Sequence, residues 1–94
     1  MAHRIGWSAR AIQDVESIAA YIAGDSPAYA RTIVRKIVNQ TTMLARFPRA
    51  GRKVPEFDNE NIREVFAYSY RIIYELQGSE VIIASVIHGK RIIH

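Results

Sequence analysis

Cysteine is absent from this chain of 94 residues. Without cysteine, neither a disulfide framework nor a thiolate metal site can form, and a reducing cytoplasm is the expected compartment. Histidine is scarce as well, and the three histidines lack the spacing of metal ligands; they are His3, His88 and His94. The sequence therefore predicts neither a metal site nor a bound cofactor.

Long apolar runs are also missing. The longest run, Val81 to Ile87, is interrupted by Ser85 and is far shorter than the roughly 20 residues that a membrane-spanning helix needs. The N-terminal residues contain no apolar core of a signal peptide. There is no internal repeat, phosphate-binding glycine loop, nucleophile elbow or calcium loop. We therefore expect a cytoplasmic protein that does not enter membranes.

The residues that are present give an ordinary globular composition with a basic excess. Hydrophobic residues make up 49% and charged residues 23% of the chain, which predicts one domain over residues 1–94. The formal net charge is +4 and the sequence pI is about 9.8, which favours polyanions or acidic proteins as partners. The basic residues concentrate late in the chain: Arg46, Arg49, Arg52, Lys53, Arg63, Arg71, Lys90 and Arg91.

The first part of the chain predicts a short strand followed by a helix. Residues 4–7 indicate the strand, and Ser8 is suited to cap the helix because its hydroxyl can accept a free backbone N–H. Gly24 is a typical helix stop. Between them, apolar residues recur at three- and four-residue spacing, as in an amphipathic helix: Ala11, Ile12, Val15, Ile18, Ala19 and Ile22.

A second helix is expected directly afterwards. Ser26 can cap it, and Pro27 suits the first helical position because the missing N–H costs nothing there. Phe47-Pro48 should end it, since the residue before proline resists helical geometry. Its apolar face consists of Ala30, Ile33, Val34, Ile37, Thr41 and Leu44. The short turn between the two helices predicts an antiparallel hairpin.

The remainder of the chain predicts a loop and a sheet. Residues 49–61 show no usable period and form a loop whose charge changes from basic to acidic. Beyond it, three segments rich in β-branched and aromatic residues predict strands: Ile62 to Ala67, Tyr70 to Leu76 and Val81 to Ile87. These strands should form a three-stranded antiparallel meander packed on the helices, so the predicted fold class is α+β.

The last hairpin allows a prediction of register. Gly78-Ser79 makes a plausible two-residue turn with glycine in its first central position. Without interruption, this register pairs Tyr70 with Ile87. It then places Arg71 and His88 as diagonal neighbours on the face away from the helices.

The turn before it leaves two registers open. A two-residue loop, Tyr68-Ser69, would turn Arg63 toward the helices and carry Glu64 outward. A three-residue loop beginning at Ala67 would instead place Arg63 outward with Arg71. We favour the longer loop, because burial of Arg63 would need a paired charge.

A series of short motifs runs along almost the whole chain: Ser8-Ala9, Asp14, Tyr21-Ile22-Ala23, Ser26-Pro27, Phe47-Pro48, Gly51-Arg52, Arg63-Glu64, Tyr70-Arg71-Ile72-Ile73-Tyr74, and His88 with Arg91. In this order and at these intervals they resemble the RelE/ParE toxin superfamily, the toxic halves of type II toxin-antitoxin pairs. The resemblance implies a strand, a helix hairpin and a twisted antiparallel sheet. It also implies a stable complex with a cognate antitoxin, ParD-like or RelB-like, whose flexible segment folds over the toxin.

The superfamily contains two activities on one fold, so the fold alone does not choose between them. RelE-like members cut messenger RNA inside the ribosome, which requires an acid, a base and cations together. Under this alternative the catalytic candidates are Arg63, Arg71 and His88, with Glu64 as a base only if the two-residue loop forms. RelE-like nucleases usually carry a lysine-rich groove and a C-terminal tyrosine or histidine, but this chain has few lysines and no such tyrosine.

We therefore favour the ParE-like hypothesis, in which the protein inhibits DNA gyrase by binding and breaks no bond itself. The affinity would come from exposed basic and apolar side chains. The target-binding candidates are Arg52, Arg63, Arg71, Lys90, Arg91, Ile92 and Ile93. Arg71 is expected to matter most, because the family-like motifs are densest around it.

Overall fold

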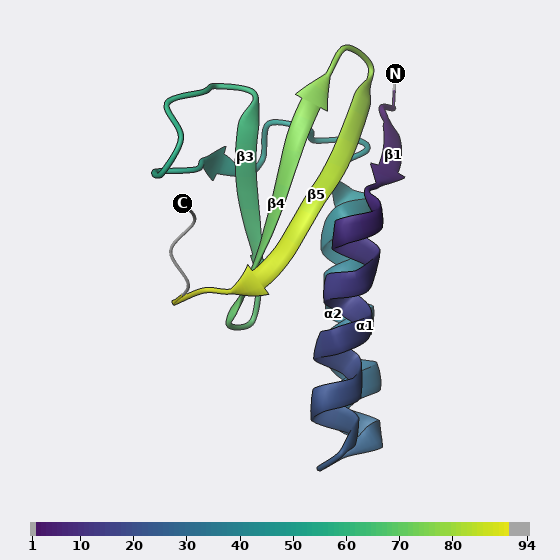
Figure 1. Ribbon diagram of the computed structural model, residues 1–94. Coiled ribbons are helices and arrows are strands. Elements are labelled where there is room, and N and C mark those ends of the chain that lie inside the picture. Colours follow the sequence, from purple (N-terminus) through teal and green to yellow (C-terminus); the bar gives the residue numbers. More distant parts are fainter. Residues whose placement is uncertain (1, 91–94) are drawn as a thin grey trace.

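The computed structural model describes residues 2–90, and it consists of a helix hairpin packed on one face of a twisted five-stranded sheet (Figure 1). In chain order the elements are β1 (Arg4–Trp7), α1 (Ala9–Ala23), α2 (Pro27–Met43), β2 (Arg52–Lys53), β3 (Ile62–Ala67), β4 (Tyr70–Gln77) and β5 (Glu80–His88). The strand order across the sheet is β1-β5-β4-β3-β2. This arrangement confirms the predicted α+β class. Among the described residues, no helix is long and apolar enough to cross a membrane.

The helices begin where their capping residues predicted. Ser8 accepts a hydrogen bond from the Ala11 N–H at 3.0 Å, and Ser26 accepts one from the Tyr29 N–H at 3.2 Å. α1 ends before Gly24 as expected. Each cap satisfies a backbone donor that the first turn of a helix leaves free.

α2 ends earlier than predicted. Its last residue is Met43, whereas the sequence suggested that the helix would continue to Phe47-Pro48. The chain tightens first, because the N–H groups of Leu44 and Ala45 donate to carbonyls only three residues back. The turn therefore forms before proline could terminate the helix.

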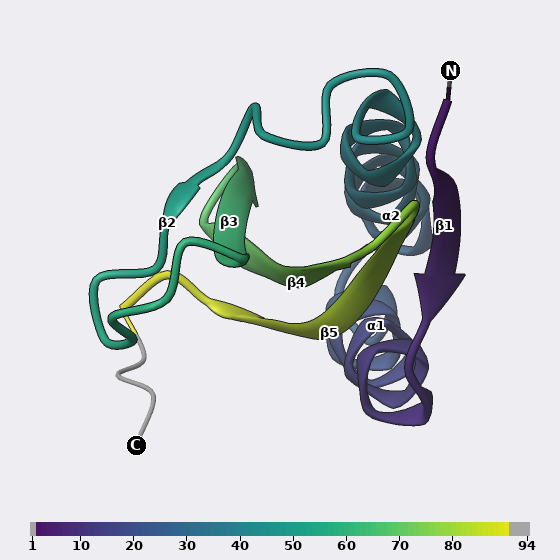
Figure 2. The same cartoon turned by 90° about the horizontal axis from the view of Figure 1, so that it is seen from above.

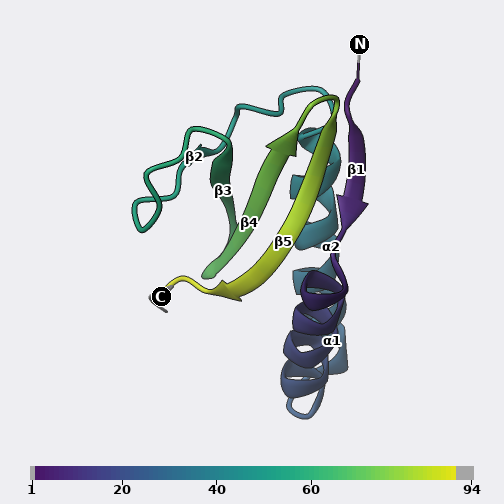
Figure 3. The same ribbon diagram turned by 45° about the horizontal axis from the view of Figure 1, so that its top comes forward.

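The main core lies between the hairpin and the sheet. Its buried members come from both helices and from β3, β4 and β5: Ala11, Ile33, Ile37, Leu44, Val65, Ala67, Ile72, Tyr74, Val81, Ile83 and Val86. The hairpin is longer than the sheet, so the turn between α1 and α2 lies well beyond the ends of the strands (Figures 1 and 3). Only the parts of α1 and α2 that are distant from the turn between them therefore pack on the strands.

Two strand pairings were not expected from the sequence. β1 pairs in parallel with β5, which turns the predicted meander into a mixed sheet. β2, only two residues long, forms inside the expected loop and pairs with β3 at the opposite edge, as Figure 2 shows. Both pairings depend on partners that local periodicity does not identify.

The last hairpin follows the predicted register at first and then departs from it. Gln77 pairs with Glu80 as expected, but a β-bulge between Ile73 and Tyr74 shifts the register by one residue. Beyond the bulge, Arg71 pairs with Ile87 instead of lying diagonal to His88. The prediction that Arg71 and His88 share a face is therefore wrong.

Side chains of α1 explain the bulge. Ala84 has no pairing partner on β4, yet its carbonyl accepts a hydrogen bond from the Ser8 hydroxyl at 2.9 Å. The next disturbed group, the Val86 N–H, donates to a carboxylate oxygen of Asp14, also at 2.9 Å. A bulge frees backbone groups from the ladder, and here the helix satisfies them.

The turn between β3 and β4 has two residues, not the three that we favoured. Ala67 pairs with Tyr70, and Tyr68 adopts a positive φ of 53°. This register places Arg63 opposite Tyr74, on the side that faces the helices, and carries Glu64 to the outer face. The preference for an outward Arg63 is therefore wrong.

Candidate functional site

Arg71 lies on the outer face of β4, yet only 4% of it is exposed. Its guanidinium makes a bidentate pair with Glu56, with both N–O distances at 2.8 Å. It also donates through Nε to Glu64 at 2.7 Å. The hydrogen bonds to Glu56 raise the pKa of Arg71, burial opposes that rise, and Glu64 adds to it. The guanidinium therefore stays charged and is held by two carboxylates.

Glu64 links Arg71 to a second arginine. Its carboxylate is completely buried, and its other oxygen accepts from Nε of Arg52 at 2.6 Å. Arg52 itself remains largely exposed and lies over the Phe66 ring at 5.5 Å from the centroid, a cation–π contact. Glu64 does face outward, but both of its oxygens are engaged and shielded from solvent. It is not placed to act as a general base.

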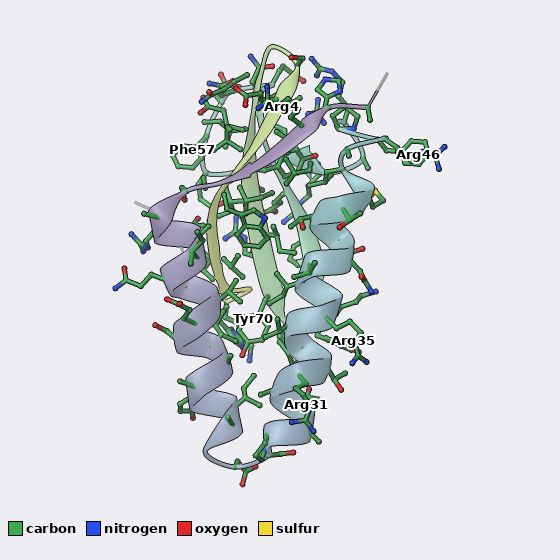
Figure 4. All side chains as sticks on the ribbon, turned by 90° about the vertical axis from the view of Figure 1, so that its right-hand side faces the viewer. Arg4, Arg31, Arg35, Arg46, Phe57 and Tyr70 are labelled. Atoms are coloured by element: carbon green, nitrogen blue, oxygen red, sulfur yellow. The ribbon has the colours of Figure 1, made fainter. Side chains whose placement is uncertain are left out.

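The loop between β2 and β3 buries this ion cluster, which consists of Arg52, Glu56, Glu64 and Arg71. Val54 and Phe57 of the loop pack against Ile73 and Ile87 on the outer face of the sheet, forming a small second core (Figure 2). Figure 4 labels Phe57 at this side of the molecule. The cluster holds two positive and two negative side chains, so it adds little to the net basic character of the surface. Sequence reasoning treated this segment as an open loop.

Two apolar residues and one acid in the loop were the signal that could have indicated this packing. Val54 is completely buried, and Phe57 is half-buried. Both lie close to Glu56, which supplies the carboxylates for Arg71. In an otherwise polar loop, this spacing is suited to a segment that folds back on a sheet.

Arg63 lies near the opposite end of β3 from the turn and is also engaged. Its Nη1 donates to the carbonyl of Gly51 at 2.8 Å, and its Nη2 pairs with Glu60 at 3.1 Å. The side chain is only 14% exposed. The partner that our reasoning required for a buried Arg63 is therefore present, and it comes from the same loop.

Gly51 is required by this packing. A Cβ at this position would lie 2.5 Å from the Glu64 carbonyl oxygen and 2.7 Å from the Tyr74 hydroxyl. The Gly51 N–H donates to that hydroxyl, which in turn donates to the carbonyl of Pro48 at 2.7 Å. Burial is the main cause of the raised pKa of Tyr74, so the hydroxyl stays protonated and structural.

His88 is exposed at the end of β5 and does not join the arginines. It pairs with Tyr70, and the two rings make an edge contact with centroids 5.8 Å apart. Arg63 pairs with Tyr74, so it lies about 13 Å further along β4. Arg71 is on the other face. The structure thus brings none of the three catalytic candidates together.

The remaining target-binding candidates lie at the end of the chain. Lys90 is exposed, and its N–H donates to Nδ1 of His88 at 3.3 Å. Arg91, Ile92 and Ile93 lie outside the described residues. Within residues 2–90 there is also no group of three side chains able to hold a metal ion. The exposed candidates are therefore Arg52, His88 and Lys90.

This geometry suits binding better than bond cleavage. General acid–base catalysis needs proton donors and acceptors within hydrogen-bonding reach of the reacting atoms. Here Glu56 and Glu64 hold Arg71, while His88 is on a different face. Arg52 and Lys90 are exposed, so both can contact a macromolecular surface, although Arg52 also pairs with Glu64.

Comparison with known proteins places this fold in a family. The chain matches, over residues 5–93, the family described as the ParE toxin of type II toxin-antitoxin system, parDE. A curated relative from Sinorhizobium fredii, the candidate toxin Y4kP, is 39% identical over 49 residues, which are 52% of this chain and 51% of that protein. The match thus spans about half the length of that relative.

Solved structures show the same fold at low sequence identity. The chromosomal ParDE toxin-antitoxin system from P. aeruginosa is 20% identical, with 93% of this chain and 96% of that chain covered and a TM-score of 0.75. The toxin-antitoxin complex RelBE2 from Mycobacterium tuberculosis is 17% identical, with 94% and 99% covered and a TM-score of 0.68. The free E. coli toxin RelE mutant is 17% identical, with 96% and 86% covered and a TM-score of 0.69.

Likeness to both the ParDE and RelBE2 systems is expected where one fold carries two activities. The family itself matches over residues 5–93, which include nearly every described residue. The chain therefore belongs to the ParE toxin family of type II toxin-antitoxin systems.

Proposed function

We propose that the protein inhibits DNA gyrase by binding to it and that a cognate antitoxin neutralises this activity. The observation that carries the proposal is the ion cluster around Arg71. A metal-free ribonuclease needs free cations and a free base at one place. In this protein the central arginine is bidentate with Glu56, and the candidate base Glu64 is buried between two arginines.

The gyrase contacts are assigned to the exposed basic residues near the sheet and to the end of the chain. Arg52 and Lys90 are exposed, and Lys90 leads directly into Arg91, Ile92 and Ile93. The cations would steer the protein toward a negatively charged target surface, and the apolar side chains after them would supply contact area from which water is excluded. Arg63 and Arg71 have a supporting role, since they hold the loop that positions Arg52.

The neutralising partner is a ParD-like or RelB-like antitoxin. The family match supports this part of the proposal, and the formal charge of +4 favours an acidic segment. A flexible, acid-rich chain that orders on binding can cover a large part of so small a toxin. Under this proposal, gyrase and antitoxin would meet the protein in the cytoplasm.

The decisive experiment compares the two targets directly. The purified full chain is added to a gyrase supercoiling reaction and, separately, to ribosomes translating a defined messenger RNA. We expect that supercoiling is lost and that gyrase-dependent DNA cleavage appears. Primer extension should show that the messenger RNA stays intact. Cleavage of the messenger with normal supercoiling would show a ribonuclease instead.

Two variants test the assigned contacts. Lys90→Ala combined with Arg91→Ala should weaken gyrase inhibition at least about tenfold, the effect of removing one or two well-placed contacts. Arg10→Ala is the matched control, because Arg10 is an exposed cation on α1 with only a surface pair to Asp14. Equal inhibition by the wild type, the double variant and the Arg10→Ala control would exclude the end of the chain as a gyrase contact.

A further inference from the structure

The unpaired cations of this protein do not lie where the sequence clusters them. Arg52, Lys53, Arg63 and Arg71 all pair with carboxylates of the loop or of β3. Among residues 2–90, the lysines and arginines without an ion pair are Arg4, Arg31, Arg35, Lys36, Arg46, Arg49 and Lys90. Most of them belong to α2 and the turn that follows it.

The segment around α2 has charge of one sign only. Residues 26–55 contain no aspartate or glutamate, and their seven basic residues are Arg31, Arg35, Lys36, Arg46, Arg49, Arg52 and Lys53. α1 differs, since it carries Asp14 and Glu16 against a single arginine. The two helices of the hairpin thus present surfaces of different charge.

The cations of α2 share the face opposite the core. Ile33, Ile37 and Thr41 are buried against α1 and the sheet. The opposite face, which we call the α2 basic face, is exposed and consists of Arg31, Arg35, Lys36, Asn39 and Thr42 of α2 together with Arg46 in the turn that follows the helix. Figure 4 labels Arg31 and Arg35 on α2 and Arg46 on the turn just beyond the end of the helix. From Arg31 to the end of α2 the row extends about 18 Å.

Between the cations this face is mainly polar. The hydroxyls of Thr32 and Thr42 donate to carbonyls one turn back, so these side chains lie against the helix. Val38 is the only large hydrophobic residue between positions 31 and 46 that is classed as exposed in the structure. The arginines and the lysine are therefore the longest side chains on the face.

A polar, cationic face of this kind fits nucleic acid better than protein. The centre of a protein interface is depleted in charge and enriched in apolar and aromatic anchors. Protein–DNA interfaces are polar and strongly positive, and arginine, lysine, threonine and asparagine supply most phosphate contacts. Single-strand binders add exposed aromatic platforms among their cations for base stacking. In the α2 basic face no aromatic residue lies between the cations, although Tyr29 and Phe47 are exposed at its two ends.

We propose that the α2 basic face binds the phosphate backbone of duplex DNA without reading its sequence. A rigid row of arginines on a helix can follow a rigid duplex, whose charge density is about one negative charge per 1.7 Å of axis. The choice of DNA over an RNA duplex rests on the proposed gyrase function, which places the protein beside DNA. No residue of the α2 basic face is among those to which the gyrase contacts are assigned.

The test measures DNA binding without gyrase. Fluorescence anisotropy of a labelled duplex of about 20 base pairs is recorded with the full chain between about 50 and 200 mM NaCl, where phosphate contacts change affinity steeply. The test variant combines Arg31→Gln, Arg35→Gln and Arg46→Gln. The matched control combines Arg4→Gln, Arg10→Gln and Lys53→Gln, three exposed cations outside the face. Both triple variants lower the formal net charge from +4 to +1.

We expect the α2 variant to lose at least about tenfold in affinity and to show a salt slope shallower by about 2.7, or 0.9 for each lost phosphate contact. The control should keep most of the affinity and slope. Equal losses in the two variants would overturn the proposal, since net charge alone would then explain binding. No duplex binding by the wild type, tighter binding of an RNA duplex, or equal competition by polyglutamate would overturn it as well.

The outcomes also separate this inference from the proposed function. Gyrase inhibition with no affinity for free duplex rejects the α2 contact and leaves the gyrase proposal standing. Duplex binding through the α2 basic face without gyrase inhibition rejects the gyrase proposal and leaves the DNA contact of α2 standing. Circular dichroism of both triple variants confirms that each one is folded before either assay.

Discussion

At the scale of single residues, Arg71 shows how a family-like motif can have a structural role. From the sequence, Arg71 was expected to matter most among the target-binding candidates. In the structure Arg71 neutralises Glu56 and Glu64, and Glu64 is completely buried. Loss of toxicity in Arg71→Ala would therefore not identify a target contact, because the fold itself would be weakened.

We predict that Arg71→Ala lowers the free energy of unfolding by about 3–5 kcal/mol, because it removes one of the two arginine partners of the buried Glu64 carboxylate and the only bidentate partner of Glu56 among the ion pairs described. Urea denaturation followed by circular dichroism measures the change. Arg71→Lys keeps the charge but loses the bidentate geometry, so its loss should be smaller.

A double-mutant cycle of Arg71 and Glu56 separates the energy of this ion pair from other effects of the two replacements. Glu56→Gln in the Arg71→Ala background should cost less than Glu56→Gln alone, since the contact is already gone. An Arg71→Ala protein within about 0.5 kcal/mol of wild type, as for an ordinary surface change, would show that the cluster is not buried in solution.

Arg63 illustrates what residue-level reasoning could and could not provide. The requirement that a buried Arg63 have a paired charge was sound, and Glu60 and the Gly51 carbonyl meet it. The conclusion drawn from it was wrong, because the partners come from a loop whose path the sequence pattern does not define. The requirement for a charged partner of Arg63 was predictable here, but the residues that supply this partner were not.

At the scale of elements, both helices and four of the five strands followed from the sequence, while β2 and part of the sheet register did not. The amphipathic period of α1 and the capping serines Ser8 and Ser26 define both helix starts. The Gly78-Ser79 turn correctly sets the first pairs of the last hairpin. The bulge that then reverses the direction of His88 depends on Ser8 and Asp14, more than 70 residues away in the chain.

Asp14 gives the test of this explanation. We predict that Asp14→Ala destabilises the protein by about 1–3 kcal/mol, because the Val86 N–H loses its acceptor in a partly buried position. Thermal and urea unfolding measure the loss. Asp14→Asn should cost less, since its amide oxygen can still accept that hydrogen bond.

A control separates the bulge contact from the surface pair that Asp14 makes. Arg10→Ala removes only the exposed Arg10–Asp14 pair and should change stability by less than about 0.5 kcal/mol. If Asp14→Ala and Arg10→Ala had the same small effect, the hydrogen bond to β5 would contribute nothing to the bulge.

At the scale of the whole molecule, the positions of the basic residues in the sequence do not show where unpaired positive charge lies in the structure. Four of the late basic residues, Arg52, Lys53, Arg63 and Arg71, are paired with carboxylates of the same loop or of Glu64. Five of the seven unpaired cations among residues 2–90 instead lie on α2 and in the turn that follows it. Net charge was predictable, but its distribution required the fold of the loop over the sheet.

This distribution predicts how stability responds to salt. Buried ion pairs are screened little, whereas exposed like charges on α2 repel one another within a Debye length of about 10 Å at 0.1 M salt. Arg31 and Arg35 are four positions apart on the helix, a repulsive spacing that costs about 0.2–0.5 kcal/mol. Salt should therefore raise the melting temperature, by about 2–4 °C for a gain of about 0.5 kcal/mol in a domain of this size.

The Arg31→Gln/Arg35→Gln/Arg46→Gln variant is the matched comparison, because it removes the repulsion and should melt at nearly the same temperature in low and high salt. Calorimetry in sodium chloride checks both proteins, and a non-binding anion is preferred so that screening is not confused with ligand binding. A melting temperature that falls with salt in the wild type would mean that exposed attractive pairs such as Lys53 with Asp58 outweigh the repulsion on α2. In that case the α2 basic face would not dominate the surface electrostatics of the protein.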